Sequence, residues 1–593
     1  MLKHELIEGS RLPVAVNGIQ VNFCKNVECS NFGVPADTKK QPKGKGAKAR
    51  GADSYSVNSR KGYHGKVAPA LECDLCGEKP PIKSNLAIYE EMNRMLGYFI
   101  EQPTGCPDEK CPNHHVDVKA GKPYYQSFGR TKSGSQRFRC KLCKTTFAVG
   151  ISTRRQRQPY KNVQVFRLLV NKMPLKRICE AADISMPTLY DKIDFLHKQC
   201  IEFASIREKE LLNGMHIRRL YVAIDRQDYV INWNRSLDKR NVVLSSVGSA
   251  DSTTGYVFGM HLNFDPVADP VAIEYDSEGL KDYEKRAPFR KYARLWLRQD
   301  YDDAAANPSP QIWNNSSSLM GDIESTYQNS LNREDVEVPD APDETTKLPS
   351  YGMQIHTDYT LYGHFFFLKK LFTGVDKIRF FMDQESGIRS ACLSAFVDEI
   401  KAGKCDAFYV RINKALTVDE RRKALAKVKK RWKILKKANP GLSDSELKLQ
   451  IIKEQISKLR KIGKWQDKWV IHPFPDMSEP EKAICYLTDM GRYDEDHMAW
   501  LYNKASLHAI DRFFMQARRR ISLLERPITT PSAGKRRWFG YSPYNPVMVM
   551  KMLDIFRVFY NFIEAGKDNH TPAMKLGLAK GVVSMEDVIY YAR

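Results

Sequence analysis

Two short apolar runs in the chain each lead to an aspartate. Leu220–Asp225 has the sequence LYVAID, and Lys377–Asp383 has the sequence KIRFFMD. Short runs rich in aliphatic and aromatic residues predict buried β-strands. We therefore expect Asp225 to be the last core residue of one strand and Asp383 to end another.

The periodicity around these runs predicts an α/β core. Turns that contain Asn, Asp or Gly separate three expected strands, at Leu220–Ile231, Asn241–Val247 and Gly255–Phe264, which suggests an antiparallel meander. The strand that ends at Asp383 is expected between two helices, and a last strand follows the second of them. The expected ranges are Tyr359–Phe372 and Ile388–Lys401 for the helices and Asp406–Ile412 for the strand. The chain thus has a meander followed by a helix, a strand, a helix and a strand, and this is the order of elements in an RNase H-like fold.

Two segments interrupt this core. Residues 265–350 are acidic and become rich in Pro and Ser, which predicts an insertion that is partly helical near 283–300 and irregular afterwards. Thr417–Gly463 predicts a helical hairpin that breaks at Asn439–Gly441 and has lysine-rich outer faces. Those faces could bind the phosphate groups of a nucleic acid, or they could be merely solvated.

Eight of the 13 cysteines lie before residue 144, in two copies of the pattern C-x4-C followed by C-x2-C. Four thiolates at such spacings are typical of a structural Zn²⁺ site. The sequence thus predicts two zinc sites, with the ligands Cys24, Cys29, Cys73 and Cys76 in the first and Cys106, Cys111, Cys140 and Cys143 in the second. We expect His64, His114 and His115 to be surface residues.

Basic residues follow the second cysteine cluster. Arg137 and Arg139 alternate with Phe138 on an expected strand, which places Phe138 inward and both arginines outward. This strand could be part of a DNA-facing ribbon, and solvated arginines are an equal alternative. Arg154 and Arg155 belong to a basic hinge.

Three helices are expected after this hinge. A short turn at Asp183–Ser185 separates the second helix from the third, and Ser185 is suited to cap the third helix. This arrangement is typical of a helix-turn-helix DNA reader, and a plain three-helix bundle is the alternative. The side chains that would face the major groove are those of Met186, Thr188, Tyr190 and Lys192.

Composition and charge indicate a multidomain protein with a polyanionic partner. The chain has 593 residues and a net charge of +24, and Thr417–Lys468 holds 17 basic against 6 acidic residues. Such an excess favours nucleic acid, and a lysine-rich soluble surface is the alternative. No opening signal peptide and no run of ~18 apolar residues are evident. We therefore expect a cytoplasmic, nucleoid-associated protein without a membrane segment.

A third acid is expected on the later helix Ala505–Leu524. Asp511 lies at the edge of the apolar stripe of this helix and could face a cleft. Glu525 lies near the same edge but about 21 Å farther along, so both cannot reach one metal pair. We prefer Asp511 to Glu525 and to the loop acids at 494–496. Clustered carboxylates suit two Mg²⁺ ions that bridge the attacking and leaving oxygens of a phosphoryl displacement.

Other acids near the two expected strand ends are rivals of Asp225 and Asp383. These are Asp228, Asp251, Asp358 and Glu385. Glu385 fits better as an acid in the first turn of the following helix.

Several motifs in order resemble those of prokaryotic insertion-sequence transposases of the DDE/DDD class, in the retroviral-integrase-like superfamily. They are CPDEKCPNH, RFRCKLCKTTF, the helix-turn-helix, AIDRQD, FFMDQESGIRSA, HAIDRFFMQARRR and FRVFYNFI with NHTPAMKLGLAKG. The chain departs from the pattern in an aspartate where many relatives carry glutamate, in a second cysteine cluster and in the acidic insertion.

The resemblance implies zinc ribbons, a helix-turn-helix and an RNase H-like catalytic core with a helical insertion. The expected domains are 1–100 and 101–152 (zinc modules), 155–205 (reader), 215–540 (core, with insertions at about 265–350 and 414–470) and 541–593 (helical tail). It implies a homodimer or higher oligomer on double-stranded DNA, with Arg518 and Arg519 also near the DNA. The alternatives are an inactive, transposase-derived regulator and a nuclease without strand transfer.

Overall fold

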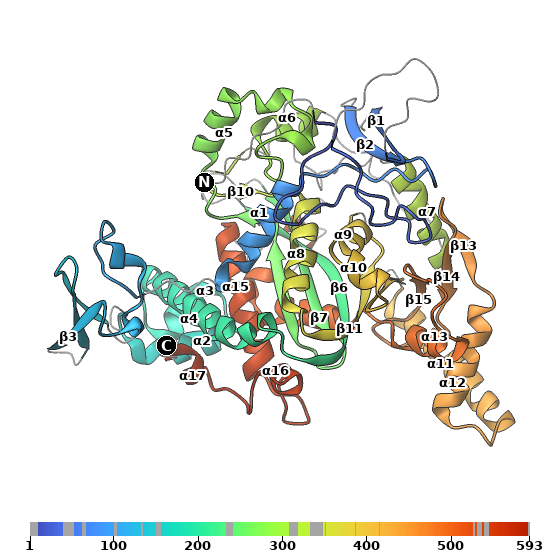
Figure 1. Ribbon diagram of the computed structural model, residues 1–593. Helices are drawn as coiled ribbons and strands as arrows, with labels where there is room; N and C mark the ends of the chain where they lie inside the picture. Colours follow the sequence, from blue (N-terminus) through green and yellow to red (C-terminus); the bar gives the residue numbers. More distant parts are fainter. Residues whose placement is uncertain are drawn as a thin grey trace, which may run out of the picture. The chain divides into compact units, whose positions relative to one another are not determined.

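The computed structural model of the chain (Figure 1) forms two compact units. The first unit comprises Met1–Met95, Leu211–Arg519 and Leu523–Met550, and the second comprises Leu96–Glu210, Arg520–Ser522 and Lys551–Arg593. The residues that the structure describes are 10–38, 53–61, 67–99, 104–131, 135–149, 156–232, 241–306, 318–332, 348–349, 351–385, 387–413, 416–525, 528–529, 537–538 and 545–590. The two expected cysteine modules therefore belong to different units.

An eight-stranded sheet is the centre of the first unit. Its strand order is β13-β14-β15-β12-β11-β6-β7-β8. The bounds are β6 Ile217–Asn232, β7 Asn241–Asp251, β8 Val257–Leu262, β11 Val375–Asp383, β12 Cys405–Ile412, β13 Arg460–Ile462, β14 Asp467–Ile471 and β15 Lys482–Tyr486. The five strands expected from the sequence are all present, and β13 to β15 are additional.

The sheet contains both antiparallel and parallel strand pairs. β6, β7 and β8 form an antiparallel meander, whereas β6, β11 and β12 run parallel to one another. β13, β14 and β15 extend the other edge through antiparallel pairing. β11 lies in the middle and its residues from Ile378 to Asp383 are all buried, which fits its nearly continuous apolar sequence.

Helices cover both faces of this sheet. On one face, the ring of Phe380 on β11 packs 5.6 Å from that of Phe365 on α8 (Thr357–Leu371) and 4.8 Å from that of Phe396, which lies between α9 (Ile388–Ala395) and α10 (Val397–Lys401). On the other face, Arg379 Nη2 lies 3.1 Å from His497 Nε2 on α13 (Glu495–Lys504). α14 (His508–Arg520) lies on that second face too, because its side chains pack against β7, as described below.

The acidic insertion differs from its prediction. Two short 3-10 turns, Asp282–Glu284 and Ala287–Phe289, lie where a helix was expected. The helices are α5 (Pro270–Gly279), α6 (Arg298–Ala306) and α7 (Leu319–Asn332), and the short strands β9 (Phe264–Asp265) and β10 (Met353–Gln354) pair with each other. α7 packs on the sheet, since Tyr327 bonds to Asp467 of β14 at 2.5 Å. The insertion is thus partly integrated into the core.

The expected helical hairpin is confirmed. α11 spans Val418–Ala438 and α12 spans Asp444–Ile456, with a turn at Asn439–Gly441. Capping boxes at Thr417 and Ser443 begin the two helices.

The first cysteine module belongs to the sheet-containing unit. It contains the antiparallel strands β1 (Tyr55–Lys61) and β2 (Val67–Cys73), and α1 (Asn85–Leu96) follows it. Its small core consists of Leu12, Cys24, Ala36, Tyr55, Leu71, Cys73 and Ile82.

The second unit joins the other cysteine module, three helices and the C-terminal tail. Strands β3 (Tyr125–Arg130), β4 (Gln136–Cys140) and β5 (Thr146–Val149) form one antiparallel sheet. The helices are α2 (Asn162–Leu169), α3 (Leu175–Ala182), α4 (Met186–Leu212), α15 (Pro546–Val558), α16 (Pro572–Leu576) and α17 (Met585–Ile589). A buried ion pair between Arg557 and Glu208, at 2.6 Å, ties α15 to α4, so the tail packs with the three helices.

Helices long and apolar enough to cross a membrane were sought among the described residues, and none was found.

Candidate active site and metal centres

Asp225 and Asp383 lie side by side on neighbouring strands. The parallel register pairs Ile224 of β6 with Met382 of β11, so the next residues along both strands are Asp225 and Asp383. Equivalent residues of adjacent strands point to the same face of a sheet, here the face covered by α13 and α14. The expected meeting of these two side chains is therefore observed.

A third carboxylate joins this pair. Ligand oxygens of Asp225, Asp383 and Glu385 all lie within 4.8 Å of one another, so the three residues could hold a metal ion. Asp225 is 2% exposed and Asp383 is 6% exposed. The backbone N–H of the following residue donates to each aspartate, from Arg226 at 2.7 Å and from Gln384 at 2.8 Å. We call these three acids the carboxylate cluster.

Two arginines lie beside the carboxylate cluster. Arg226 Nε is 3.1 Å from Glu385, and Arg411 Nη1 is 3.9 Å from Asp383. Arg411 also pairs with Asp322 of α7 at 2.7 Å, so the insertion helps to position this guanidinium group. When all groups are charged, three carboxylates face two arginines, and the remaining negative charge favours a cation.

Helix α14 crosses the face that carries the carboxylate cluster. Gly248 of β7 pairs directly with Asp225, and a Cβ at Gly248 would stand only 2.8 Å from Ile510 Cδ1 and 2.9 Å from Phe514 Cε1. The absence of a side chain at Gly248 lets the helix approach the strand this closely. Farther along, Arg518 Nη1 donates to Gln227 Oε1 at 2.6 Å. Asp511 therefore lies on a helix that packs over the strand next to Asp225.

The start of α14 is held in place by a buried polar group. Glu479 is 1% exposed, and its Oε1 accepts hydrogen bonds from Ser506 Oγ at 2.6 Å and from the Leu507 backbone N–H at 2.8 Å. Lys482 Nζ donates to the Ala505 carbonyl at 2.8 Å. These bonds set the position from which α14 runs toward Asp225.

The other acids considered from the sequence lie outside the carboxylate cluster. Asp511 and Glu525 are not members of the carboxylate cluster. Asp494 caps α13, and Asp496 pairs with Lys453. Asp251 accepts from Thr254 within its own turn, and Asp228 is bonded to Ser245. These bonds account for the loop acids, and they leave Asp511 as the acid on the helix that covers the site.

Two details of this site differ from the sequence expectations. Glu385 was expected in the first turn of a helix, but it precedes α9 and lies in the carboxylate cluster. Its position two residues beyond the end of β11 was the signal that could have indicated this. Asp225 is not the last core residue of its strand, because β6 continues to Asn232 and the side chains of Tyr229 and Ile231 are buried.

Lys83, from the segment that follows the first cysteine module, lies close to the loop that bears Glu385. Lys83 Nζ pairs with Asp358 Oδ2 at 2.5 Å at the start of α8. Burial opposes ionisation of Asp358, but the charge of Lys83 outweighs it and lowers the pKa of Asp358. A Cβ at Gly387, whose φ is +82°, would stand 2.6 Å from Asp358 Oδ1. The Lys83–Asp358 pair therefore packs directly against Gly387, the residue that precedes α9.

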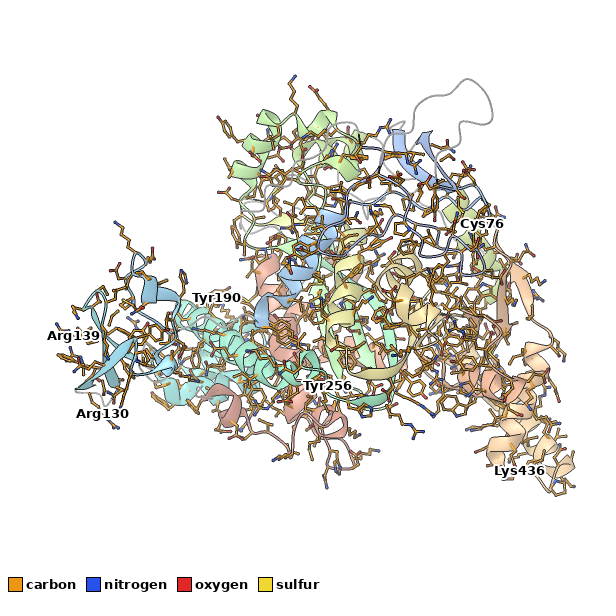
Figure 2. All side chains as sticks on the ribbon, viewed as in Figure 1. Cys76, Arg130, Arg139, Tyr190, Tyr256 and Lys436 are labelled. Atoms are coloured by element: carbon orange, nitrogen blue, oxygen red, sulfur yellow. The ribbon has the colours of Figure 1, made fainter. Side chains whose placement is uncertain are left out.

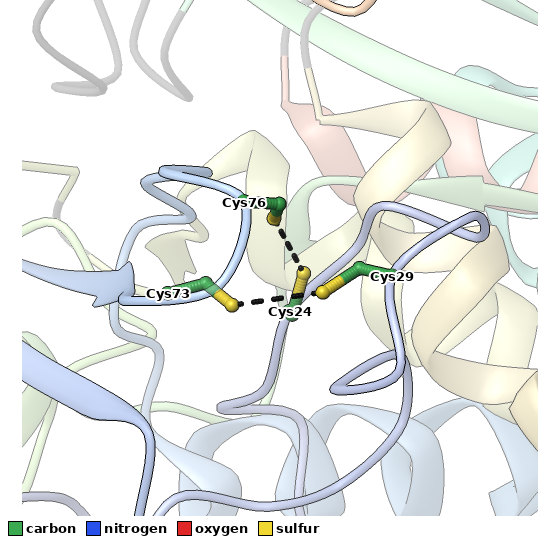
Figure 3. A group of neighbouring side chains, drawn as sticks. All are labelled: Cys24, Cys29, Cys73 and Cys76. Atoms are coloured by element: carbon green, nitrogen blue, oxygen red, sulfur yellow. Dashed lines mark hydrogen bonds between the residues drawn. The ribbon is translucent and has the colours of Figure 1, made fainter.

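The first cysteine module brings four sulfur atoms together (Figure 3). Cys24 Sγ lies 3.5 Å from Cys76 Sγ, and Cys29 Sγ lies 3.8 Å from Cys73 Sγ. These separations exceed the ~2.05 Å of a disulfide bond. They are close to the ~3.8 Å between ligands of a tetrahedral Zn²⁺ with Zn–S bonds of ~2.3 Å. The group could hold a metal ion, and its geometry is compatible with zinc.

The second module repeats this geometry. Cys106 Sγ lies 3.2 Å from Cys143 Sγ, and Cys111 Sγ lies 3.8 Å from Cys140 Sγ. Thr145 beside Cys143 lowers the pKa of that thiol to about 6 through hydrogen bonds of its side chain and backbone, which favours the thiolate form that a metal binds. His114 Nδ1 bonds to the Cys106 carbonyl at 2.7 Å and is not one of the four grouped residues.

The two modules also share an asparagine and a tyrosine that the sequence analysis missed. Asn31 Nδ2 donates to Cys73 Sγ, and Asn113 Nδ2 donates to Cys140 Sγ, both at 3.3 Å. Tyr55 and Tyr125 each accept a hydrogen bond from the backbone N–H of the first cysteine of their module, at 3.0 Å. The repeated C-x-N after each C-x4-C is the sequence signal that could have indicated the shared asparagine.

The three expected helices, and the turn at Asp183–Ser185 between α3 and α4, are present in the second unit. The Thr188 backbone N–H donates to Ser185 Oγ at 3.4 Å, and Tyr190 is 42% exposed on α4 (Figure 2). Lys192, however, was wrongly expected to face a groove. It is 1% exposed, and its Nζ donates to Arg157 O, Gln158 O and Asn162 Oδ1 at 2.6 to 3.0 Å. Its ammonium group instead fixes the chain that leads into α2.

The arginines of the expected ribbon point outward. The guanidinium groups of Arg137 and Arg139 lie 5.2 and 5.7 Å from the ring of Phe128, which is 41% exposed, whereas Phe138 packs against the cysteine core. Figure 2 shows Arg139 at the surface of this module. Arg154 and Arg155 lie outside the described residues. Arg519 is exposed, whereas Arg518 is bonded to Gln227.

A scan against protein-family models and a search of curated proteins both find no match to this chain.

Proposed function

We propose that this protein is a divalent-metal-dependent DNA transposase of the DDE/DDD class. The proposal rests on one observation. Carboxylates from two neighbouring parallel strands lie within 4.8 Å of one another on a buried face of the sheet. Clustered buried carboxylates are costly unless a cation or other positive charge offsets them. Hard divalent cations such as Mg²⁺ prefer this type of oxygen ligand.

The sheet supports the same proposal. In an RNase H-like core, an antiparallel meander is followed along the chain by two parallel strands beside its first strand. The strand order β8-β7-β6-β11-β12 and its directions fit this description, and Asp225 and Asp383 occupy the first and fourth of these five strands in chain order. This arrangement supports the proposal that the cluster supplies the catalytic acids of such a fold.

Asp511 is the proposed third ligand. It follows Ile510, which packs against the strand position opposite Asp225, so Asp511 lies on the helix that borders the cluster. Glu385 is the alternative, because it is already part of the cluster, although Arg226 pairs with it. The variants Asp511→Asn and Glu385→Gln distinguish these two ligand sets by which of them weakens metal binding more.

The chemistry follows from these groups. Two bound Mg²⁺ ions would stabilise both the attacking and the leaving oxygen of an in-line phosphoryl displacement. Asp225 and Asp383 would hold the ions and fix the reacting phosphate, while Arg226 and Arg411 limit the movement of Glu385 and Asp383. Water would first attack a DNA phosphodiester and release the 3′-oxygen as a 3′-OH. The same site would then use that hydroxyl to attack a target phosphodiester, forming a new P–O bond as the target strand's own 3′-oxygen leaves, because both reactions are in-line displacements at phosphorus.

The remaining parts of the chain would deliver the DNA. We assign structural zinc to both cysteine groups, and the reading of element ends to the second unit, whose α4 exposes Tyr190 and whose ribbon exposes Arg139. The resemblance to these transposases also implies assembly as a dimer on paired ends, which is part of the proposal.

The proposal is tested with Asp225→Asn and Asp383→Asn in a strand-cleavage assay. Each variant should lose Mg²⁺-dependent cleavage by at least about 10³-fold, in line with the loss of a major electrostatic contribution to the transition state, and should still bind DNA. The matched control is Asp228→Asn, on the same strand but exposed and bonded to Ser245. Full cleavage by either cluster variant would refute the proposal. Site-specific binding without any product from the wild type would indicate a regulator. Cleavage without joined 3′-OH products would indicate a nuclease.

A further inference from the structure

The helix α11 carries a charge distribution that the carboxylate cluster does not explain. Between Arg421 and Ala438 it has ten basic residues and no acidic residue, and no residue of α11 is buried. Its neighbour α12 has a balanced composition, with three acids and two lysines. The two helices belong to one hairpin and share the same solvent, so solvation alone does not account for the difference.

The basic side chains of α11 cover its outer face. The partly buried residues Leu425, Val428, Trp432 and Leu435 form the inner stripe. The Trp432 ring packs 5.7 Å from that of Phe474, and Lys448 of α12 lies 6.0 Å from it. The opposite face is exposed and extends from Arg422 to Lys437, which is about 22 Å along the axis.

Few of these charges have a partner. Arg422 lies 3.6 Å from Asp419, and Lys436, visible in Figure 2, pairs with Asp444 at 2.7 Å. Six others have no acidic partner within ion-pair distance among the residues that the structure describes, namely Lys427, Lys429, Lys430, Arg431, Lys433 and Lys437. Like charges at i, i+4 spacing, such as Lys429 and Lys433, destabilise a helix. The outer face is therefore unfavourable for the isolated protein and suited to a polyanion.

The α11 hairpin is firmly connected to the side of the sheet that carries the carboxylate cluster. Leu447, Ile451 and Ile452 of α12 are buried, and Lys453 pairs with Asp496 at the start of α13. α13 in turn packs on the cluster face, where Trp500 lies 5.8 Å from Tyr221 of β6, ring to ring. A ligand held along α11 would thus be held by a hairpin that contacts α13 on the cluster face.

We infer that the outer face of α11 binds the phosphate backbone of duplex DNA without reading its sequence, an inference that rests on the proposed function. Lysine side chains are mobile point charges that suit such contacts, and the face offers no group placed to read base edges in a groove. The expected role is to hold DNA against the unit that carries the carboxylate cluster, independently of the end-reading second unit.

The test compares two triple variants of the full chain. The arm variant carries Lys429→Gln, Lys430→Gln and Lys433→Gln, and glutamine keeps a good helix propensity. The control variant carries Lys281→Gln, Lys370→Gln and Lys404→Gln, which removes the same charge from exposed positions elsewhere in the first unit. Thermal unfolding confirms that both are folded.

Binding to a random-sequence DNA duplex is then measured over a range of salt concentrations. Each lost phosphate contact should reduce the slope of log K against log salt by ~0.9, so the arm variant should lose up to ~3 units of slope and the control none. Equal slopes for wild type and arm variant would overturn this inference. If the wild type cleaves DNA but the salt slope is the same in the wild type and the arm variant, only the role of α11 is refuted. If the arm variant has a smaller salt slope than the wild type but the wild type does not cleave DNA, only the proposed enzymatic activity is refuted.

Discussion

The two cysteine modules have the same interior but different surroundings. Both gather four sulfurs, both place an asparagine amide 3.3 Å from one sulfur, and both use a tyrosine hydroxyl at the first cysteine. The first module, however, packs onto the sheet-containing unit, where Lys464 donates to its Gly77 carbonyl at 2.6 Å and Lys401 lies 5.9 Å from its Phe32 ring. The second displays Arg139 and Phe128 to solvent.

The shared four-cysteine interior therefore does not determine what such a module does. A thin core of this size would depend on a bound metal ion for folding. Its outer residues then decide whether it braces a neighbouring element or contacts a ligand. We interpret the first module as a brace for the carboxylate cluster and the second as a reader of DNA.

The largest expected difference between the modules comes from removing their sulfur ligands. Two double variants test this, Cys73→Ser with Cys76→Ser in the first module and Cys140→Ser with Cys143→Ser in the second. Each should remove one zinc ion and the roughly 10–16 kcal/mol of folding free energy that its binding supplies. The first pair should also weaken Mn²⁺ binding at the carboxylate cluster, whereas the second pair should leave it unchanged and weaken only DNA-end binding. Zinc content and Mn²⁺ titration measure both effects. Equal loss of Mn²⁺ binding in the two double variants would remove the distinction between brace and reader.

A smaller effect is expected from the ion pair between Lys83 and Asp358. Lys83→Ala leaves the largely buried Asp358 carboxylate without its partner, which should cost up to about 3 kcal/mol of the free energy of unfolding, the lower end of the range for a fully buried pair. Thermal or denaturant unfolding gives this value, and Mn²⁺ affinity reports on the adjoining loop. The double variant Lys83→Met with Asp358→Asn should recover much of the stability, because no buried charge remains.

The control for this prediction is Lys119→Ala in the second module, where the side chain is exposed and the cost should stay within about 0.5 kcal/mol. If Lys83→Ala and Lys119→Ala change stability and Mn²⁺ affinity equally, the first module does not support the cluster.

The smallest expected effect should be the same in both modules. Asn31→Ala and Asn113→Ala each remove one N–H···S hydrogen bond, which should destabilise either module by about 1–2 kcal/mol and accelerate zinc release. The rate of zinc transfer to a chelator measures this. A response in only one module would show that their interiors are not equivalent after all.

Much of the central sheet could be predicted from local sequence. The run KIRFFMD is apolar enough to require a buried strand, and the acid at its end is unusual in such a place. The order of strands and helices then indicated that Asp225 and Asp383 would meet, which the register of β6 and β11 explains. The cysteine spacings likewise sufficed to define both sulfur groups.

Other features depend on contacts that one sequence does not reveal. Lys192 has the spacing of a groove-facing residue, but its ammonium is bonded to three oxygens that come from an earlier segment of the chain. Gly248 gives no local sign that α14 will pack there. The position of α7 on the sheet follows from the pairing of Tyr327 with Asp467, 140 residues away. Such long-range partners decide burial, and periodicity describes only one segment at a time.

The central claim is that Asp225 and Asp383 together bind a divalent metal ion, and Mn²⁺ titration followed by electron paramagnetic resonance tests it directly. Wild type should bind Mn²⁺ at a site that Asp225→Asn and Asp383→Asn each lose, while Asp269→Asn, at the helix cap of α5, should keep it. Identical Mn²⁺ binding by wild type and both cluster variants would contradict the account.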